Sequence, residues 1–425
     1  ITIDNKISAV DFSGNELLTK VDLYGNPIEA IDVSNLKDLT YLDVSSLDEG
    51  KLTDLNVGNN PKLTELRCYN NKLASLDLSH CPELTKVDAK NNEIADINLN
   101  SNLKLQYVNL NNNKLTAIDV TRLTSLTDLL LGGNKLTNID VSKNTSLYDL
   151  TLWSNKLTQL DLTKNKTLQT LSFQNNNIHT LDLSTNTDLR QINCGGNGMS
   201  ACDLDEFFWT LPTYPNISSD ERPRGAALTL NTGNEDTPND YATSDTSIAT
   251  GKGWITNTTG DATGCPSAYV TFNTPDNGTI RLLDADNNEI KSGEKVLKNT
   301  TIKIVATPAP GYKYDGLRID NTFYAKKTEL VITKYTNIEF GFSEGTTGID
   351  NVTTDEFGAS VEVGNGTIYI KTSALATATV FNTNGKTVDT AVVNGSKSFN
   401  TVSGAYIVKL TSDDGKTVVK KVVVK

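Results

Sequence analysis

The residue types that most often carry out catalysis or bind metal ions are scarce in this chain. Its 425 residues include two histidines, His80 and His179, and five cysteines. No nucleophile-elbow, phosphate-loop or H-E-x-x-H motif occurs, and no C-x-x-C pair. His80 precedes Cys81, but the side chains of adjacent residues usually diverge, and no third group completes a catalytic set. We therefore expect no enzyme activity, no metal centre and no cofactor.

Side chains suited to recognising a partner are more frequent and more regularly spaced. Aromatic residues and arginine are enriched at the hot spots of protein interfaces. Our candidate partner-binding residues are Tyr24, Tyr41, Arg67, Tyr69, Tyr107, Asp128, Leu130, Asp149 and Trp153. They fall at the third, fifth and seventh positions of a recurring pattern of about 21 residues. The units of that repeat must therefore position them.

Leucines open the units of this repeat. They lie 21 residues apart, with one interval of 24, at Leu18, Leu39, Leu63, Leu84, Leu105, Leu126, Leu147, Leu168 and Leu189. Each opens the pattern L-x-x-L-x-L-x-x-N-x-L or a close variant. This pattern resembles the leucine-rich repeat family over about half of the chain. The resemblance implies a solenoid of stacked parallel strands with few helices, whose outward side chains line a concave face.

The ninth position of most units is an asparagine. In the leucine-rich repeat family this residue turns inward, and its amide bonds the backbone of adjacent coils. The ladder would comprise Asn26, Asn71, Asn92, Asn113, Asn134, Asn155, Asn176 and Asn197. The unit opened by Leu39 has three extra residues around 48–50 and lacks this asparagine. A bulged loop should interrupt the ladder there.

A second column is acidic and belongs to the L-D-L segment that completes most units. It comprises Asp11, Asp32, Asp77, Asp119, Asp140, Asp161 and Asp182, with Asn56 and Asn98 at two gaps. Stacked carboxylates repel one another, so either each caps its own turn or cations lie between them. The alternation in L-D-L also predicts a second short extended segment, and hence a second β-like face.

The end of a solenoid needs a cap, and residues 201–212 predict a helix that Pro212 stops. Asp203 could be its N-cap, with Glu206 three residues on. Further short elements are expected at 227–231, 244–251 and 254–256, so the first domain spans residues 1–262. Cys68 and Cys194 occupy apolar repeat positions and should be core residues. A bridge between Cys202 and Cys265 is one of the pairings left open.

Residues 265–343 alternate between apolar and polar side chains, with Gly, Pro and Asn at the turns, which predicts a small β domain. Strands are expected at 268–273, 278–282, 301–312, 329–333 and 336–342. The segment 306–314, the preceding Asn277-Gly-Thr and the closing Ile-Glu-Phe-Gly-Phe resemble the divergent B-repeat of internalin-like bacterial surface proteins. That resemblance implies a β-grasp-like spacer domain without catalysis.

Residues 350–425 carry three motifs in order: Val380-Phe-Asn-Thr-Asn-Gly-Lys386, Gly404-Ala-Tyr406-Ile-Val-Lys and the terminal Lys420-Lys-Val-Val-Val-Lys425. They resemble the C-terminal sorting domain of Bacteroidetes type IX secretion substrates. The resemblance implies a β-sandwich that an outer-membrane export machine recognises. The sorting-signal residues would be Gly385, Lys386, Gly404, Tyr406, Lys421 and Lys425.

Net charge and hydropathy exclude further classes of protein. The formal net charge is −12, which argues against a nucleic-acid ligand. Residues 1–264 contain 21 basic and 34 acidic side chains, so the first domain carries the acidity. No run of about 18 apolar residues predicts a transmembrane segment. The chain opens with Ile1 and no signal peptide, which we read as a mature or trimmed form.

These observations predict a mainly β protein, secreted or held at the outer-membrane surface. Its concave face would bind an extracellular or surface protein, including one of a host, with Tyr69, Tyr107 and Trp153 as anchors. One alternative is a carbohydrate ligand, because aromatic rings on a flat sheet can stack on sugars. Another is a purely structural surface component.

Overall fold

The computed structural model describes residues 5–214, 226–233, 235–319, 322–344, 359–364 and 366–424. The chain divides into two compact units, residues 1–267 and 268–425. The first unit is the predicted leucine-rich solenoid, and the second contains two separate hydrophobic cores. The proposed division into three domains stays a prediction, since the second unit comprises both later parts.

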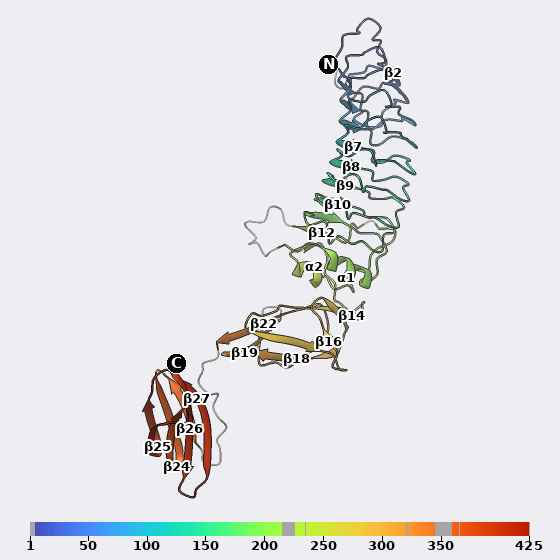
Figure 1. Cartoon of the computed structure of the whole chain (residues 1–425). Helices are drawn as coiled ribbons and strands as arrows, with labels where there is room; N and C mark the ends of the chain where they lie inside the picture. Colours follow the sequence, from blue (N-terminus) through green and yellow to red (C-terminus); the bar gives the residue numbers. More distant parts are fainter. Residues whose placement is uncertain are drawn as a thin grey trace. The chain divides into compact units, whose positions relative to one another are not determined.

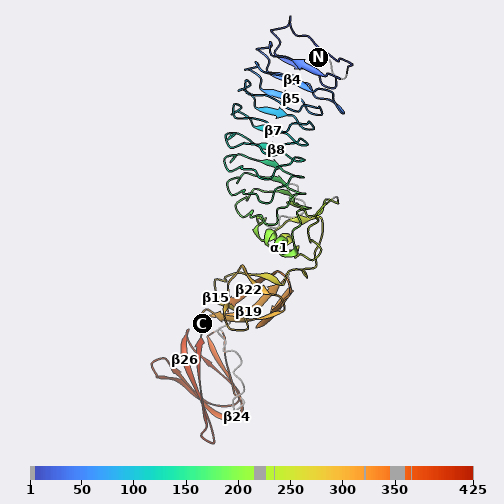
Figure 2. The same ribbon diagram turned by 90° about the vertical axis from the view of Figure 1, so that its right-hand side faces the viewer.

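The solenoid contributes one short parallel strand from each coil to an 11-stranded sheet (Figures 1 and 2). In sheet order the strands are β1 Lys20–Asp22, β3 Tyr41–Asp43, β5 Glu65–Arg67, β6 Lys86–Asp88, β7 Tyr107–Asn109, β8 Asp128–Leu130, β9 Asp149–Thr151, β10 Thr170–Ser172, β11 Gln191–Asn193, β12 Ala227–Thr229 and β13 Ile255–Thr256. Equivalent residues of neighbouring repeats pair directly, as Tyr107 does with Asp128. The predicted repeat architecture is confirmed.

The leucines that define the repeat form the solenoid core. From Leu39 to Leu189 the unit-opening leucines are fully buried, as is the middle residue of each strand of this 11-stranded sheet from β3 to β11. The residues on either side of that middle residue point to the other face, as Asp128 and Leu130 do around Leu129. Strand alternation therefore places the third and fifth repeat positions on the concave face.

The inward asparagine ladder is also confirmed. Asn113 is typical: its Nδ2 donates to Ala89 O at 3.0 Å and to Leu110 O at 3.1 Å, and its Oδ1 accepts from Ile94 N at 3.0 Å. The unit with the extra residues lacks one rung, because exposed Leu47 stands at the ladder position. Beyond the bulge the ladder resumes.

A second buried asparagine column was not predicted. It lies three residues before the unit-opening leucines, at Asn60, Asn102, Asn144, Asn165 and Asn186. Asn144 Nδ2, for example, donates to Val120 O at 2.9 Å and to Leu123 O at 2.7 Å of the preceding coil. The solenoid is therefore bonded through side-chain amides on two sides of its core.

The predicted second β face is largely wrong. Hydrogen-bonded strands on the convex side occur only in the pair β2, Ala30–Asp32, and β4, Asp54–Asn56, among the described residues. Elsewhere the L-D-L segments carry no strand. A curved solenoid separates its coils more on the outside than on the concave side, so the backbone groups there do not pair.

The acidic column caps turns, which is one of the two interpretations of the sequence. Each aspartate accepts a hydrogen bond from the backbone N–H two residues on, as Asp119 Oδ1 does from Thr121 N at 2.9 Å. Asn56 and Asn98 accept the equivalent bond from Gly58 and Asn100. The column is thus a series of Asx turns that reverse the chain on the convex side.

We expect these turns to make the solenoid sensitive to acid. Hydrogen bonds from the Ser or Thr two residues on lower the pKa of six column carboxyls, namely Asp11, Asp32, Asp77, Asp119, Asp140 and Asp161. A carboxyl whose pKa is lowered on folding stabilises the fold above its unfolded pKa of about 3.9, and this stabilisation is lost as pH falls through the folded value. The melting temperature, followed by circular dichroism, should therefore drop below about pH 4.

The chain supplies the control for this prediction, because asparagine already stands at two column positions. A variant with all six aspartates replaced by asparagine keeps the turns and loses the titration. Asp88 and Asp149 have pKa values raised by burial and act in the opposite sense in both proteins. An unchanged pH profile in this variant would show that other groups govern acid stability.

The C-terminal cap follows the predicted order, with one correction. It comprises helix α1, Ala201–Thr210, strand β12, helix α2, Ser247–Gly251, and strand β13. Ser200, and not Asp203, is the N-cap of α1: its Oγ accepts from Asp203 N, and the Asp203 carboxylate accepts from Ser200 N. With Ser200 as the N-cap, the backbone N–H groups at the start of the helix are satisfied better, because Asp203 then completes a capping box.

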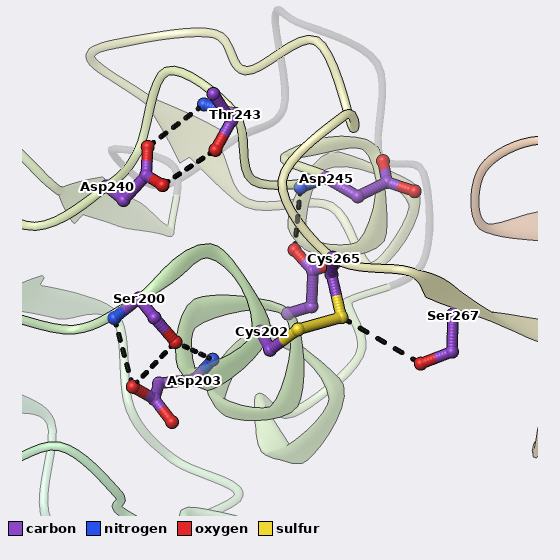
Figure 3. The surroundings of a disulfide bond; sticks show 9 residues. Ser200, Cys202, Asp203, Asp240, Thr243, Asp245, Cys265 and Ser267 are labelled. Atoms are coloured by element: carbon purple, nitrogen blue, oxygen red, sulfur yellow. Dashed lines mark hydrogen bonds between the residues drawn. A yellow bond between two sulfur atoms is a disulfide. The ribbon is translucent and has the colours of Figure 1, made fainter.

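The cysteines separate into two kinds. Cys202 and Cys265 form the disulfide that the sequence left as an option (Figure 3). Cys68, Cys81 and Cys194 are free and buried. Burial raises the pKa of the Cys81 thiol to about 11, so this thiol stays protonated and unreactive.

The first part of the second unit packs two sheets around one apolar core. One sheet has the order β17 Glu294–Leu297, β14 Ser267–Phe272, β22 Thr336–Glu344, β19 Tyr312–Ile319 and β20 Thr322–Ala325. The other has the order β16 Glu289–Ile290, β15 Gly278–Leu283, β18 Thr300–Pro308 and β21 Glu329–Ile332. The sequence pattern did not predict β16, β17, β19 and β20, which are short or interrupted by glycine.

The last part of the chain is a single bent antiparallel sheet. Its strands are β23 Ser360–Gly364, β24 Thr367–Asn382, β25 Thr387–Asn400, β26 Gly404–Ser412 and β27 Thr417–Val424. The pairing of β24 with β25 shifts register between Thr372 and Ala376. Residues from both halves of β24, such as Ile370 and Val380, share one core, so the sheet folds over itself as a small sandwich.

Candidate binding surface

The nine candidate residues lie on one face of the 11-stranded sheet or within two residues of its strands. Six lie in β3, β5, β7, β8 and β9, and Tyr24, Tyr69 and Trp153 follow β1, β5 and β9. All nine are half-buried. They are therefore held by neighbours on the sheet and do not extend freely into solvent.

Basic side chains of adjacent strands stack on the tyrosines. Lys20 Nζ lies 4.4 Å from the ring centre of Tyr41, Lys90 Nζ 4.9 Å from Tyr69, and Lys86 Nζ 5.1 Å from Tyr107. These cation–π contacts hold the rings in place before a partner binds, so binding would cost little further side-chain entropy. Burial raises the pKa of Tyr41 and Tyr69 to about 12, so both present neutral hydroxyl groups.

In the N-terminal half of this face, strands β1, β3, β5 and β6 together carry both basic and acidic side chains, and one group of them is paired. Glu65 binds Arg67 Nη2 at 2.7 Å and Lys86 Nζ at 3.3 Å. Burial alone would raise the pKa of the Glu65 carboxyl, but the bonds and charges of Arg67 and Lys86 hold it below its usual value. Glu65, Arg67 and Lys86 are therefore engaged with one another, while Asp22 and Asp43 lie opposite each other on β1 and β3.

The C-terminal half differs in its charge. Asp128 and Asp149 lie directly opposite each other on β8 and β9. Burial and the charge of Asp128 raise the pKa of the Asp149 carboxyl. From the described residues, both aspartates accept only hydroxyl hydrogen bonds, Asp128 from Thr127 at 2.6 Å and Asp149 from Thr151 at 3.3 Å. No lysine or arginine among the described residues lies within 4.0 Å of either carboxylate.

Trp153 is fixed by the preceding coil. Its ring lies over Gly132 and Gly133, and a Cβ atom on Gly132 would stand only 2.3 Å from the ring. Any larger residue at Gly132 would displace the indole. The glycine pair therefore forms the platform on which this half-buried aromatic ring rests, near the uncompensated aspartates of β8 and β9.

The sequence interpretation missed an amide chain along one edge of this face. Asn91 Nδ2 donates to Asn70 Oδ1 at 2.6 Å, and Asn112 Nδ2 donates to Asn91 Oδ1 at 2.7 Å. All three residues have φ near +55°, which asparagine tolerates better than most residues. Three Asn-Asn pairs, spaced by 21 residues in the sequence, could have predicted this chain of amides.

The described residues also bear on metal sites and membrane-spanning helices. No group of three or more His, Cys, Asp or Glu residues there could hold a metal ion. No helix there is long and apolar enough to cross a membrane.

The predicted sorting residues occupy different environments in the last sheet. Gly385, with φ of 77°, and Lys386 form the exposed turn between β24 and β25, where Lys386 N donates to Asn382 Oδ1 at 3.0 Å. Tyr406 is buried, and its hydroxyl donates to Val402 O at 2.9 Å. Gly404 opens β26 beside the Tyr406 ring, and Lys421 is exposed on β27. Lys425 lies outside the described residues.

Comparison with known proteins identifies the last domain. Residues 364–425 match the family model of the secretion system C-terminal sorting domain. This match agrees with the motifs at Gly385, Gly404 and the basic C-terminal strand. The chain thus ends in a type IX secretion sorting domain, which directs a protein to the cell surface or the extracellular space.

Three solved structures are similar to the chain at low identity. They are the functional domain of InlJ from Listeria monocytogenes (20% identity, TM-score 0.45, 100% of this chain and 75% of that one), YopM from Yersinia enterocolitica (21%, 0.37, 53% and 48%) and the leucine-rich repeat domain of APL1B (20%, 0.36, 51% and 75%). None of the curated proteins compared with the chain matches it.

Proposed function

We propose that this chain is a non-enzymatic surface or secreted protein of a Bacteroidetes-type bacterium that binds a protein partner through its concave sheet. The observation that carries the proposal is the ordered row of half-buried aromatic rings on that sheet, held by lysines and glycines of neighbouring coils. Rigid aromatic side chains on a flat, regular scaffold are the usual composition of protein-binding hot spots. The sorting domain supports an extracellular place of action.

The charge distribution favours a basic partner. Basic side chains accompany the acidic ones on the strands of the N-terminal half, whereas Asp128 and Asp149 lie on strands without lysine or arginine and could pair with a basic partner. Burial and, after it, repulsion from Asp128 raise the pKa of Asp149, and a lysine or arginine seated between the two carboxylates would offset that repulsion. Binding should therefore weaken with rising salt concentration.

The disulfide agrees with this location. Disulfide bonds form and persist in oxidising compartments such as the periplasm and the cell surface. The B-repeat-like part of the chain would serve as a spacer between the solenoid and the sorting domain.

The central test is the substitution Trp153→Ala in the full chain. Probed against an array of extracellular host and bacterial surface proteins, the wild-type chain should bind one or a few basic proteins. Loss of a hot-spot indole should weaken that binding by about 2 kcal/mol or more, which is roughly 30-fold. Biolayer interferometry at two salt concentrations measures both the loss and the salt dependence.

Tyr324→Ala is the matched control, because Tyr324 is an exposed aromatic outside the solenoid, with 36% of its surface accessible. It should leave affinity unchanged, and the melting temperature of both variants should stay near that of the wild type. Equal loss in both variants would refute a concave-face site. Glycan-array binding that depends on Trp153 but not on salt would replace the protein partner by a carbohydrate.

A further inference from the structure

The disulfide joins two points of the cap that are far apart in sequence. Cys202 lies in the first turn of α1, and Cys265 lies two residues before β14 begins (Figure 3). Their separation of 63 positions leaves 62 residues between them. The closed loop therefore contains the rest of α1 and all of β12, α2 and β13.

We propose that this disulfide is a mechanical bypass: a pull on the chain beyond Cys265 is transmitted to α1, and the enclosed part of the cap bears no load. The biological use of such a device rests on the proposed function, in which later residues attach the protein and the solenoid holds a partner. The mechanical property itself depends only on the covalent path of the chain.

Without the disulfide, a pull at residue 265 would act first on the weakest element of the sheet. Strand β13 has two residues, lies at the sheet edge and pairs only with β12. Ile255 is 49% exposed, so the strand itself buries little apolar surface, and Trp254 just before it is the first large buried side chain that the pull would reach. Its backbone bond to Ala226 and the Asn257 contact to Leu230 would break one after another. Such an edge opens at low free energy.

With the disulfide, the pull arrives at a firmly anchored element. Leu204, Phe207 and Phe208 of α1 are buried at 0–1% exposure. The Phe207 ring packs edge-on against Phe173 of the solenoid core, with ring centres 6.1 Å apart. Pulling α1 away would expose several large apolar side chains at once, which is far more costly than opening an edge strand.

The enclosed segment also bonds to itself and to α1. Asp245 N donates to Asp205 at 2.6 Å, Gly264 N donates to Thr243 O at 2.9 Å, and Lys252 Nζ donates to Leu211 O at 2.9 Å. All of these bonds lie inside the closed loop. They can hold the cap shape while the tension passes outside them through the two sulfur atoms.

Single-molecule force spectroscopy on the full chain, tethered at both ends, tests the proposal. The comparison is between the oxidised wild type and the Cys202→Ser/Cys265→Ser double variant, with the later β domains as internal references. The variant should show an additional early event at lower force, which releases up to the 54 residues that lie between α1 and Cys265, about 190 Å at 3.6 Å per residue. The oxidised wild type should lack this event.

Wild-type protein under reductant provides a second route if the variant fails to fold, and it should show the same early event. Non-reducing peptide mapping must find Cys202 linked to Cys265. The proposal is overturned if the two residues are unlinked, or if the cap of the reduced protein opens at the same force as the solenoid. Because no ligand takes part, failure here is separate from failure of the binding proposal.

Discussion

Replacing Asn113 by alanine is expected to lower the free energy of unfolding of the solenoid by about 3–5 kcal/mol. The amide is 7% exposed and makes hydrogen bonds to the backbone of the preceding coil, at Ala89 and Ile94, and of its own coil, at Leu110. Alanine removes these bonds and leaves the buried N–H of Ile94 without the oxygen it donates to. An orphaned buried donor costs about 1–3 kcal/mol beyond the bonds themselves.

The neighbouring residue offers a matched control. Asn112 is exposed, has φ of 55° and stands where the next coil has Gly133 with φ of 68°. Asn112→Gly removes one side-chain bond, to Asn91, and relaxes the backbone, so its effect should be below about 1 kcal/mol. Denaturant unfolding gives the free energies, and hydrogen exchange at Ile94 locates the opening. Equal midpoints for the two variants would contradict a structural role for the inner ladder.

The repeat explains why so much of this fold was predictable from sequence. A residue at Leu126 and one at Leu147 face the same environment, because each coil stacks on a copy of itself. Period and alternation together therefore predicted the sheet and its outward face, and the resemblance to the leucine-rich repeat family predicted the inward asparagines. The repeat also placed Asp140 and Asp161 at equivalent positions, but it left open whether they cap turns or hold cations, and the hydrogen bonds to Ser142 and Thr163 decide for the turns.

Predictions failed where the outcome depends on the spacing between coils. The L-D-L alternation is compatible with a strand, but pairing also requires neighbouring backbones about 4.8 Å apart, and curvature decides that on the convex side. The column containing Asn144 was visible as a period of 21 but interrupted by Cys81 and Leu123. A mixed column gives a weaker signal than an unbroken one.

The candidate binding surface was predicted only in outline. Strand alternation placed Tyr107 and Trp153 on the concave face, but it could not show what touches them. The stacking of Lys86 on Tyr107 and the glycine platform under Trp153 arise between different coils. That Asp128 and Asp149 lack a basic partner also becomes visible only in the structure, where the neighbouring side chains are placed.

Deleting residues 359–425 is expected to abolish delivery to the cell surface. The sorting domain has its own hydrophobic core, and the solenoid belongs to a different compact unit, so the truncated chain should still fold. What it loses is the segment that matches the secretion sorting family. The chain would be expressed behind a signal peptide in a bacterium with a type IX system, and surface protein measured by protease accessibility on whole cells.

A pair of tyrosines separates loss of the sorting fold from loss of one surface side chain. Tyr406 is 5% exposed and packs in the sorting core, so Tyr406→Ala should cost about 3–5 kcal/mol and unfold a domain of this size. Tyr369 is 47% exposed on β24, and Tyr369→Ala should leave delivery intact.

Delivery of these variants to the cell surface distinguishes two ways in which the export machinery could recognise the domain. If export requires a folded sorting domain, the truncation and Tyr406→Ala reduce surface protein to background, while Tyr369→Ala does not. If the machinery reads only the basic last strand as an extended peptide, Tyr406→Ala is delivered normally and Lys421→Ala is not, because Lys421 is exposed whether or not the core is packed. Surface protein at the wild-type level after truncation would remove the sorting domain from the export route altogether.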